Sequence, residues 1–213
     1  MGDCCELGYE TLKRKEQRVV HETDNFVVIP SIGQMGIEGY VMILSKAHCI
    51  GMGDVPESQY AELIELIKHT RAVLQQVYGA SSLVFEHGPR VCNVRGGGCH
   101  DHAHLHVVPG ATVARAMVPD LMERLEGPRM FFKVERTEGF KRLADIFAAR
   151  QYSYMYVDDP SMFSMVTKVN IAIPPQYLRR FVASQRGHDM WDWAAWPDRA
   201  LCRLTGDRLA GKF

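Results

Sequence analysis

The segment at residues 102–108, His-Ala-His-Leu-His-Val-Val, alternates histidines with apolar residues. In an extended strand every second side chain lies on the same face, so His102, His104 and His106 would project together while the apolar residues enter the core. In a helix, His104 would lie away from the other two. The segment therefore predicts a strand with one apolar face and one face of imidazoles, which we expect to be exposed.

The chain before this segment alternates apolar runs with turn residues. Residues 18–45 predict three short strands that pair antiparallel. A helix is predicted over 56–78, because Asp54 can cap it and Glu57 stands at the capping-box position. A strand at 82–86 and a glycine-rich loop then lead to the histidine strand.

The chain beyond Pro109 predicts further elements, with no low-complexity linker before them. They are a helix at 138–149, strands at 152–157 and 163–173, and a short helix from Pro175. The fold class is therefore α+β, an antiparallel sheet packed with helices plus an α/β C-terminal extension. We expect an N-terminal segment at 1–16, a core at 17–125 and an extension at 126–213 that packs on the core.

Composition limits the function classes. The chain has 213 residues, 46% of them hydrophobic, and 25 basic residues balance 25 acidic ones. With no basic excess, a small ligand is favoured over a long nucleic acid. The six cysteines form no regular framework, and no apolar stretch has the length of a membrane span. These features predict a cytoplasmic protein that does not bind membranes.

Three interpretations of the histidines are open. They could be satisfied structural histidines, they could bind a metal, or they could perform covalent catalysis at phosphorus, with the middle imidazole as nucleophile. The hydrolase pattern His-x-His-x-Asp-His is absent, because His106 stands where the acid would fall.

The segment resembles the His-φ-His-φ-His-φ-φ signature of the histidine-triad (HIT) superfamily of nucleotide hydrolases and transferases, with all seven positions matched. The upstream helix, strand and glycine loop match as well, so the resemblance covers residues 17–110. It implies a HIT-like sheet in which His104 is nucleotidylated and His102 and His106 support it. Cys99 stands where many relatives carry Ser or Thr to assist the leaving group.

An earlier segment, GYVMILSKAHCIGMGDV, resembles the family's Gly-His-x-Leu-(Ile/Val)-x-Pro-Lys-x-His pattern. His48 matches the last histidine. Tyr40 replaces a histidine of the catalytic network and Ser45 replaces the proline. A tyrosine can donate a hydrogen bond but carries no charge at neutral pH, so proton transfer is expected to differ from the common branch.

Further candidate substrate-binding residues lie on both sides of the triad. The resemblance places Glu86 and His87 at the ribose, and the backbone amides of Gly97 and Gly98 could approach a phosphate. In the tail, Arg179 and Arg180 could clamp a phosphate. Only one of the two can face the site, because adjacent helical residues point in different directions.

The sequence therefore predicts an enzyme that cleaves a P–N or P–O–P linkage next to a nucleoside monophosphate such as AMP, as a phosphoramidase or a dinucleoside polyphosphate hydrolase. No metal and no cofactor are expected, because the Cys-x-x-Cys of zinc-binding relatives is missing. A small-molecule nucleotide is the expected partner, and a homodimer is possible. Two alternatives remain, a non-catalytic nucleotide- or RNA-binding module with a CwfJ-like tail and a metal-dependent hydrolase.

Overall fold

A computed structural model describes residues 18–89, 102–124, 131–134, 139–148, 152–160, 164–169 and 173–213. Its eight strands form one antiparallel sheet in the order β1-β2-β3-β5-β4-β7-β8-β6. The strands are β1 (His21–Glu22), β2 (Phe26–Pro30), β3 (Val41–Ser45), β4 (Ser82–Gly88), β5 (His104–Pro109), β6 (Phe131–Val134), β7 (Ser153–Asp158) and β8 (Ser164–Val169). The predicted α+β class is confirmed.

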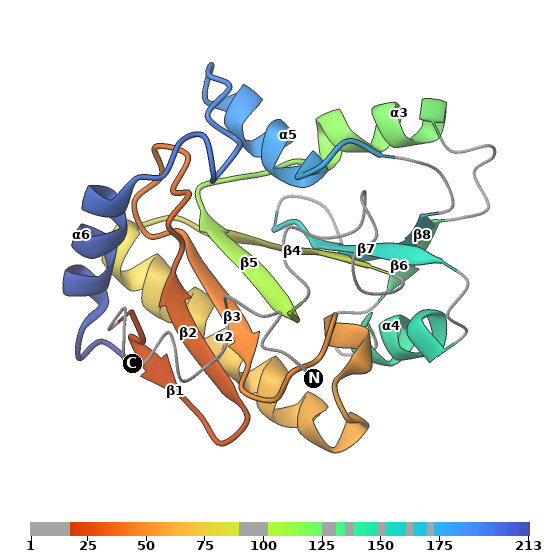
Figure 1. The fold of residues 1–213 in the computed structure, drawn as a ribbon, viewed down its shortest axis with the longest axis horizontal. Helices are drawn as coiled ribbons and strands as arrows, with labels where there is room; N and C mark the ends of the chain where they lie inside the picture. Colours follow the sequence, from red (N-terminus) through yellow and green to blue (C-terminus); the bar gives the residue numbers. More distant parts are fainter. Residues whose placement is uncertain are drawn as a thin grey trace.

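Helices cover both faces of this sheet (Figure 1). They are α2 (Tyr60–Tyr78), α3 (Ala114–Arg124), α4 (Gly139–Ala148), α5 (Tyr177–Gln185) and α6 (Arg199–Leu209), with two short 3-10 helices, η2 (Met52–Asp54) and η3 (Glu57–Gln59). One apolar cluster contains the inner residues of α2 and α4, and the other contains those of α3 and α5. The two sheet faces are therefore both buried.

The helix predicted over 56–78 begins later than expected. Asp54 lies in η2, and Pro56 keeps an extended backbone with ψ of 137°. The α-helix starts at Tyr60 after Gln59, whose side chain makes no capping bond, so the predicted capping box is wrong. The end is as expected, because Gly79 adopts a left-handed φ of 68° and donates to the Gln75 carbonyl.

The elements predicted in the tail form close to their expected bounds, as α4, β7, β8 and α5. Three others, α3, β6 and α6, were not predicted. The tail continues the sheet, because β7 pairs with β4 from Val84↔Asp158 to Gly88↔Tyr154. The β4 edge is thus occupied by the chain's own β7, and a second copy could not pair there.

The two sides of the β4–β7 pair repeat one topology. The series β3, α2, β4, β5 is followed by the series β6, α4, β7, β8, and in each the last strand lies between the other two. Both helices belong to the same apolar cluster and so to the same face. An approximate two-fold axis through the β4–β7 pair relates the halves, although the sequence contains no recognisable repeat.

In the described part of the chain, no helix is both long enough and apolar enough to cross a bilayer.

Replacing Gly88 by alanine should destabilise the protein, because the new Cβ would lie 2.1 Å from the Tyr154 ring on the paired strand. We expect a loss of about 1–3 kcal/mol in the free energy of unfolding, measured by urea denaturation. Gly206→Ala in α6 is the matched control. Its Cβ would meet nothing closer than 3.6 Å, and alanine should stabilise the helix by up to about 1 kcal/mol. Equal effects of the two substitutions would contradict the close packing of Tyr154 on Gly88.

Candidate active site

His104 at the start of β5 has a defined tautomer. Its Nδ1 lies 2.7 Å from the backbone carbonyl oxygen of His102. Because a carbonyl oxygen only accepts, Nδ1 must carry the proton, and Nε2 then holds the in-plane lone pair. The side chain is buried, with 5% of its surface exposed. His104 therefore has the electronic arrangement of a nucleophile.

His106 lies beside His104, with ring centroids 4.7 Å apart and the rings nearly perpendicular. Its other face stacks on Phe85 of β4 at 4.5 Å. The Nδ1 atom lies 2.6 Å from the hydroxyl of Tyr40, which precedes β3. Arg179 of α5 donates to the same hydroxyl at 2.7 Å. The tail thus contributes a residue to the environment of the triad.

His102 lies just before β5 and its Nε2 donates to the backbone carbonyl of Ser45 at 2.7 Å. His48 contacts it edge-on, with ring centroids 5.5 Å apart. Burial lowers the pKa of His102, the Ser45 carbonyl opposes this, and the neighbouring His48 lowers it further. His102 is consequently neutral at neutral pH. His48 thus lies beside the first histidine of the triad.

The three histidines are buried, with 2–6% of their surface exposed, and the expectation of an exposed imidazole face is wrong. Part of this cover comes from the tail, because α5 packs on the side of the sheet that carries His104 and His106 (Figure 1), and residues of α5 line the space beside them. The resulting cleft encloses about 20 Å³, the space of one water molecule. It is lined by Phe85, His87, His104, His106, Gln176, Tyr177, Leu178 and Arg179.

Glu86 and His87, both expected to bind substrate, lie on opposite faces of β4. Glu86 accepts from the Met52 amide at 2.8 Å and from the Tyr154 hydroxyl at 2.7 Å, on the α2 and α4 side, so the structure does not bring it to the histidines. Burial raises the pKa of Glu86 to about 8.

His87 lines the histidine cleft, as a substrate-binding residue would. Its Nε2 is buried and has no hydrogen-bond partner. Burial lowers the pKa of His87 to about 4, so the imidazole is neutral at neutral pH. An unsatisfied buried nitrogen in a cleft is a natural contact for a polar ligand.

Arg179 and Arg180 separate as expected from their adjacent positions. The Arg179 guanidinium is buried and donates to the carbonyls of Trp191 and Gly33 as well as to Tyr40. Arg180 stacks on the Trp191 ring at 3.6 Å, away from the cleft. Neither makes the expected phosphate clamp, because Arg179 is engaged by protein acceptors and Arg180 faces outward.

Three predicted residues, Cys99, Gly97 and Gly98, lie outside the described residues. The sequence prediction missed Phe85 and Gln176, which line the cleft. Alternation along the 82–86 strand places Phe85 on the same face as His87, a signal that could have identified it. No comparable signal exists for Gln176, because its position depends on the packing of the tail.

Among the residues that the structure describes, no group of three or more His, Cys, Asp or Glu side chains could hold a metal ion.

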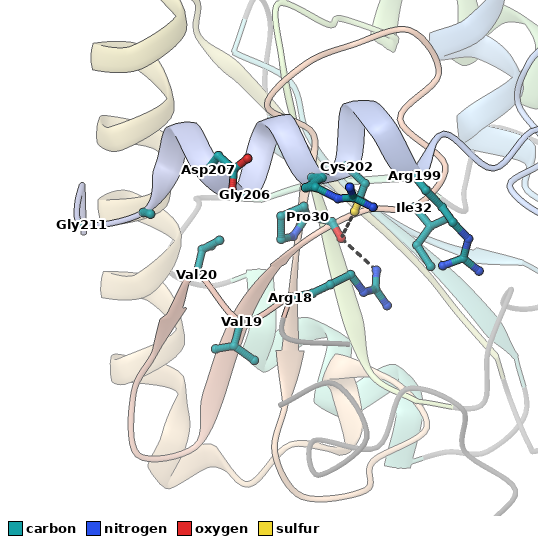
Figure 2. A pocket seen from close by; sticks show the side chains of 12 residues that line it. Arg18, Val19, Val20, Pro30, Ile32, Arg199, Cys202, Gly206, Asp207 and Gly211 are labelled. Carbon is teal, nitrogen blue, oxygen red and sulfur yellow. Dashed lines mark hydrogen bonds between the residues drawn. The ribbon is translucent and has the colours of Figure 1, made fainter. Parts of the chain in front are cut away.

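A larger cavity of about 620 Å³ lies between residues 18–20, the end of β2 and α6 (Figure 2). Arg18 and Cys202 both donate to the Pro30 carbonyl there, and Arg199, Arg203 and Asp207 supply further charges. Among the described residues that line it there is no histidine. We place the candidate active site at the smaller cleft, because only there do a nucleophile and its orienting partners converge.

No family model and no curated protein matches this chain. Among solved structures, it is similar to a HIT-like protein from Bartonella henselae described as involved in cell-cycle regulation, at 15% identity and a TM-score of 0.40 over 51% of this chain and 80% of that one. A HIT family hydrolase from Clostridium thermocellum gives 21% identity and a TM-score of 0.40, over 52% and 94%. A hypothetical histidine triad nucleotide-binding protein from Sulfolobus tokodaii gives 18% and 0.38, over 66% and 88%. All three proteins are described as histidine-triad or HIT-like proteins.

The raised pKa of Glu86 predicts a pH-dependent stability. Glu86 stays protonated in the folded chain up to about pH 8, whereas in the unfolded chain it ionises near its ordinary pKa of 4.5. The contribution of Glu86 to the free energy of unfolding is therefore fully present at acidic pH. It is lost as the pH rises from 4.5 to about 8. We expect Glu86→Gln to be more stable than the wild type at pH 8 and similar to it at pH 4.5, measured by urea denaturation across the pH range.

The exposed carboxylate Glu65, which pairs with Lys68 on the surface, provides the control as Glu65→Gln. It should leave the pH dependence unchanged. A difference between Glu86→Gln and the wild type that does not vary with pH would disprove the assignment.

Proposed function

We propose that this protein is a nucleotide hydrolase or nucleotidyl transferase that works through a covalent intermediate on His104. The observation that carries the proposal is the bond from His104 Nδ1–H to the His102 carbonyl, which directs a lone pair to Nε2. The histidine-triad signature of the sequence points to the same atom as the nucleophile. Protein groups that hold an imidazole in one tautomer are a recurring requirement of such catalysis.

In the proposed reaction, His104 Nε2 attacks the phosphorus atom next to a nucleoside. An N–P bond forms, the bond from phosphorus to the leaving group breaks, and the leaving group takes the bonding electrons and a proton from solvent water, which the later hydrolysis step returns. The Nδ1–H of His104 remains bonded to the His102 carbonyl and stabilises the positive charge that the imidazole gains. Water then cleaves the N–P bond, releasing the nucleoside monophosphate and restoring His104.

The size of the cleft limits how a substrate could bind. About 20 Å³ accommodates one water molecule and is far below the volume of a nucleotide. We therefore expect substrate binding to widen the cleft, with the reacting phosphorus next to His104 and the nucleoside outside the present cavity. Adenosine phosphoramidates, with a P–N bond, and dinucleoside polyphosphates, with a P–O–P bond, are the candidate substrates.

Incubation with adenosine phosphoramidate and with diadenosine tetraphosphate tests this function. The wild-type protein should release AMP from at least one of them, and His104→Ala should be slower by at least about 1,000-fold because it lacks the nucleophile. His69→Ala is the matched control, since His69 is an exposed residue of α2 on the other side of the sheet. The proposal fails if neither substrate yields AMP or if both variants keep full activity.

The same preparations separate the two alternatives. A binding module would hold a nucleotide unchanged in a calorimetry cell for hours, and His104→Ala would alter affinity alone. A metal-dependent hydrolase would contain stoichiometric metal by elemental analysis and would lose activity with a chelator. Mass spectrometry of His106→Gln after brief exposure to substrate should instead find a nucleotidyl group on His104.

We propose that His87 contacts the substrate through its unsatisfied Nε2. His87→Leu should raise KM for the accepted substrate. The same change should raise the free energy of unfolding by about 1 kcal/mol, because it removes an unsatisfied buried polar group. Enzyme kinetics and urea denaturation measure the two effects. An unchanged KM together with a gain in stability would show that His87 does not bind substrate.

A further inference from the structure

Arg179 is buried and bonded to protein oxygens, as is typical of an arginine that stabilises the structure and not of one that binds a ligand. It belongs to α5 in the tail, and its residue is 2% exposed. Its Nε donates to the Trp191 carbonyl at 2.8 Å and its Nη2 to the Gly33 carbonyl at 3.0 Å. These bonds fix the plane of the guanidinium, so that Nη1 reaches the Tyr40 hydroxyl at 2.7 Å.

The Tyr40 hydroxyl connects this cation to the triad. A guanidinium only donates hydrogen bonds, so the Tyr40 oxygen accepts from Arg179. Accepting a charge-assisted bond polarises the O–H and makes it a stronger donor. The atom placed to receive it is His106 Nδ1, at 2.6 Å. A second positive charge on His106, so close to a buried arginine, is electrostatically unfavourable.

We propose that Arg179 is a positioning residue which, through Tyr40, holds His106 as a neutral imidazole with its proton on Nε2. Phe85 and His104 pack against the His106 ring and keep it from rotating. His104 and His106 would then hold opposite tautomers, a lone pair on Nε2 of the first and a proton on Nε2 of the second. This tautomer is a property of the free protein, whereas its use in catalysis rests on the proposed function.

The opposite tautomers of His104 and His106 would let the two imidazoles act together on one phosphoryl group. While His104 attacks phosphorus, the Nε2–H of His106 could donate to a non-bridging oxygen of the same phosphoryl group and stabilise its developing charge. The proton is not transferred, so the step needs no change in the charge of His106. Tyrosine and a buried arginine would together perform the orienting task that a single histidine performs in the pattern which this sequence resembles.

Nitrogen-15 NMR of the full-length protein tests the tautomer directly. Signals of His106 are assigned by their loss in His106→Gln, and the two ring nitrogens are distinguished by their long-range couplings. In the wild type we expect a protonated Nε2 and an unprotonated Nδ1. Arg179→Met should give a mixture of tautomers or a charged ring, and Arg179→Lys should restore part of the wild-type state.

Arg180→Met is the matched control, because Arg180 is the next residue of the same helix and stacks outside the cleft. It should leave the His106 signals unchanged. If Arg179→Met fails to fold, Tyr40→Phe tests the same connection, since it removes only the hydroxyl. A wild-type proton on Nδ1, or an unchanged tautomer in both variants, would overturn the proposal.

A second test measures kcat and KM of the Arg179 variants with whichever substrate the protein accepts. Arg179→Met should lower kcat on the order of 10- to 100-fold with little change in KM, a typical effect of losing a group that orients a reacting side chain. It should also shift the pH profile of kcat, which a purely structural role would not do, and Arg179→Lys should recover part of both. A protein that turns over no substrate would overturn the proposed function and leave the NMR result to decide the tautomer.

Discussion

The ladder between β4 and β7 is the interaction on which the rest of the molecule depends. It joins the tail to the sheet through five residue pairs and protects an edge that would otherwise present unpaired backbone groups. On one face the ladder places Tyr154 against Glu86 and Gly88, and on the other it extends the surface on which α3 and α5 pack. Without it, the histidine face would have no cover and Arg179 would not reach Tyr40.

The same ladder relates two halves of equal topology, of which one carries the histidines. His106 lies between Met42 of β3 and Phe85 of β4 in the sheet. At the corresponding place in the second half, Thr167 lies between Phe131 and Met155. Threonine has no imidazole, so within the described residues the second half of the sheet supports and covers the candidate active site of the first half.

Most of the sheet was predictable because its strands are short apolar runs bounded by turn residues. The missed helices have identifiable reasons. Proline at 119 argues against a helix at α3, and α6 exposes so many of its residues that few apolar positions mark its spacing. The start of α2 was misplaced because a favourable cap was inferred at Asp54, whereas Pro56 keeps the chain extended there.

The candidate active site was predictable only where its residues are close in sequence. His102, His104 and His106 follow from one strand, but Arg179 and Tyr40 are 139 residues apart in the chain and meet only through tertiary packing. The opposite placement of Glu86 and His87 follows from simple alternation, yet the resemblance grouped them together. For these two residues, the alternation of side chains along the strand therefore predicted their placement better than the family resemblance did.

The charges around the cleft are arranged unusually for a site that would act on phosphates. Burial keeps His87 and His102 neutral, and among the described residues that line the cleft the one permanent cation is Arg179. That cation bonds to protein oxygens and stands behind Tyr40, instead of projecting into the cleft. In a buried site that holds little water, the Arg179 charge still acts strongly from one side chain away. Fixed dipoles also need no reorganisation during a reaction. If the proposed function holds, such an arrangement would favour a developing charge on the substrate over tight binding of its ground state, because the side chains nearest to a phosphate would be neutral.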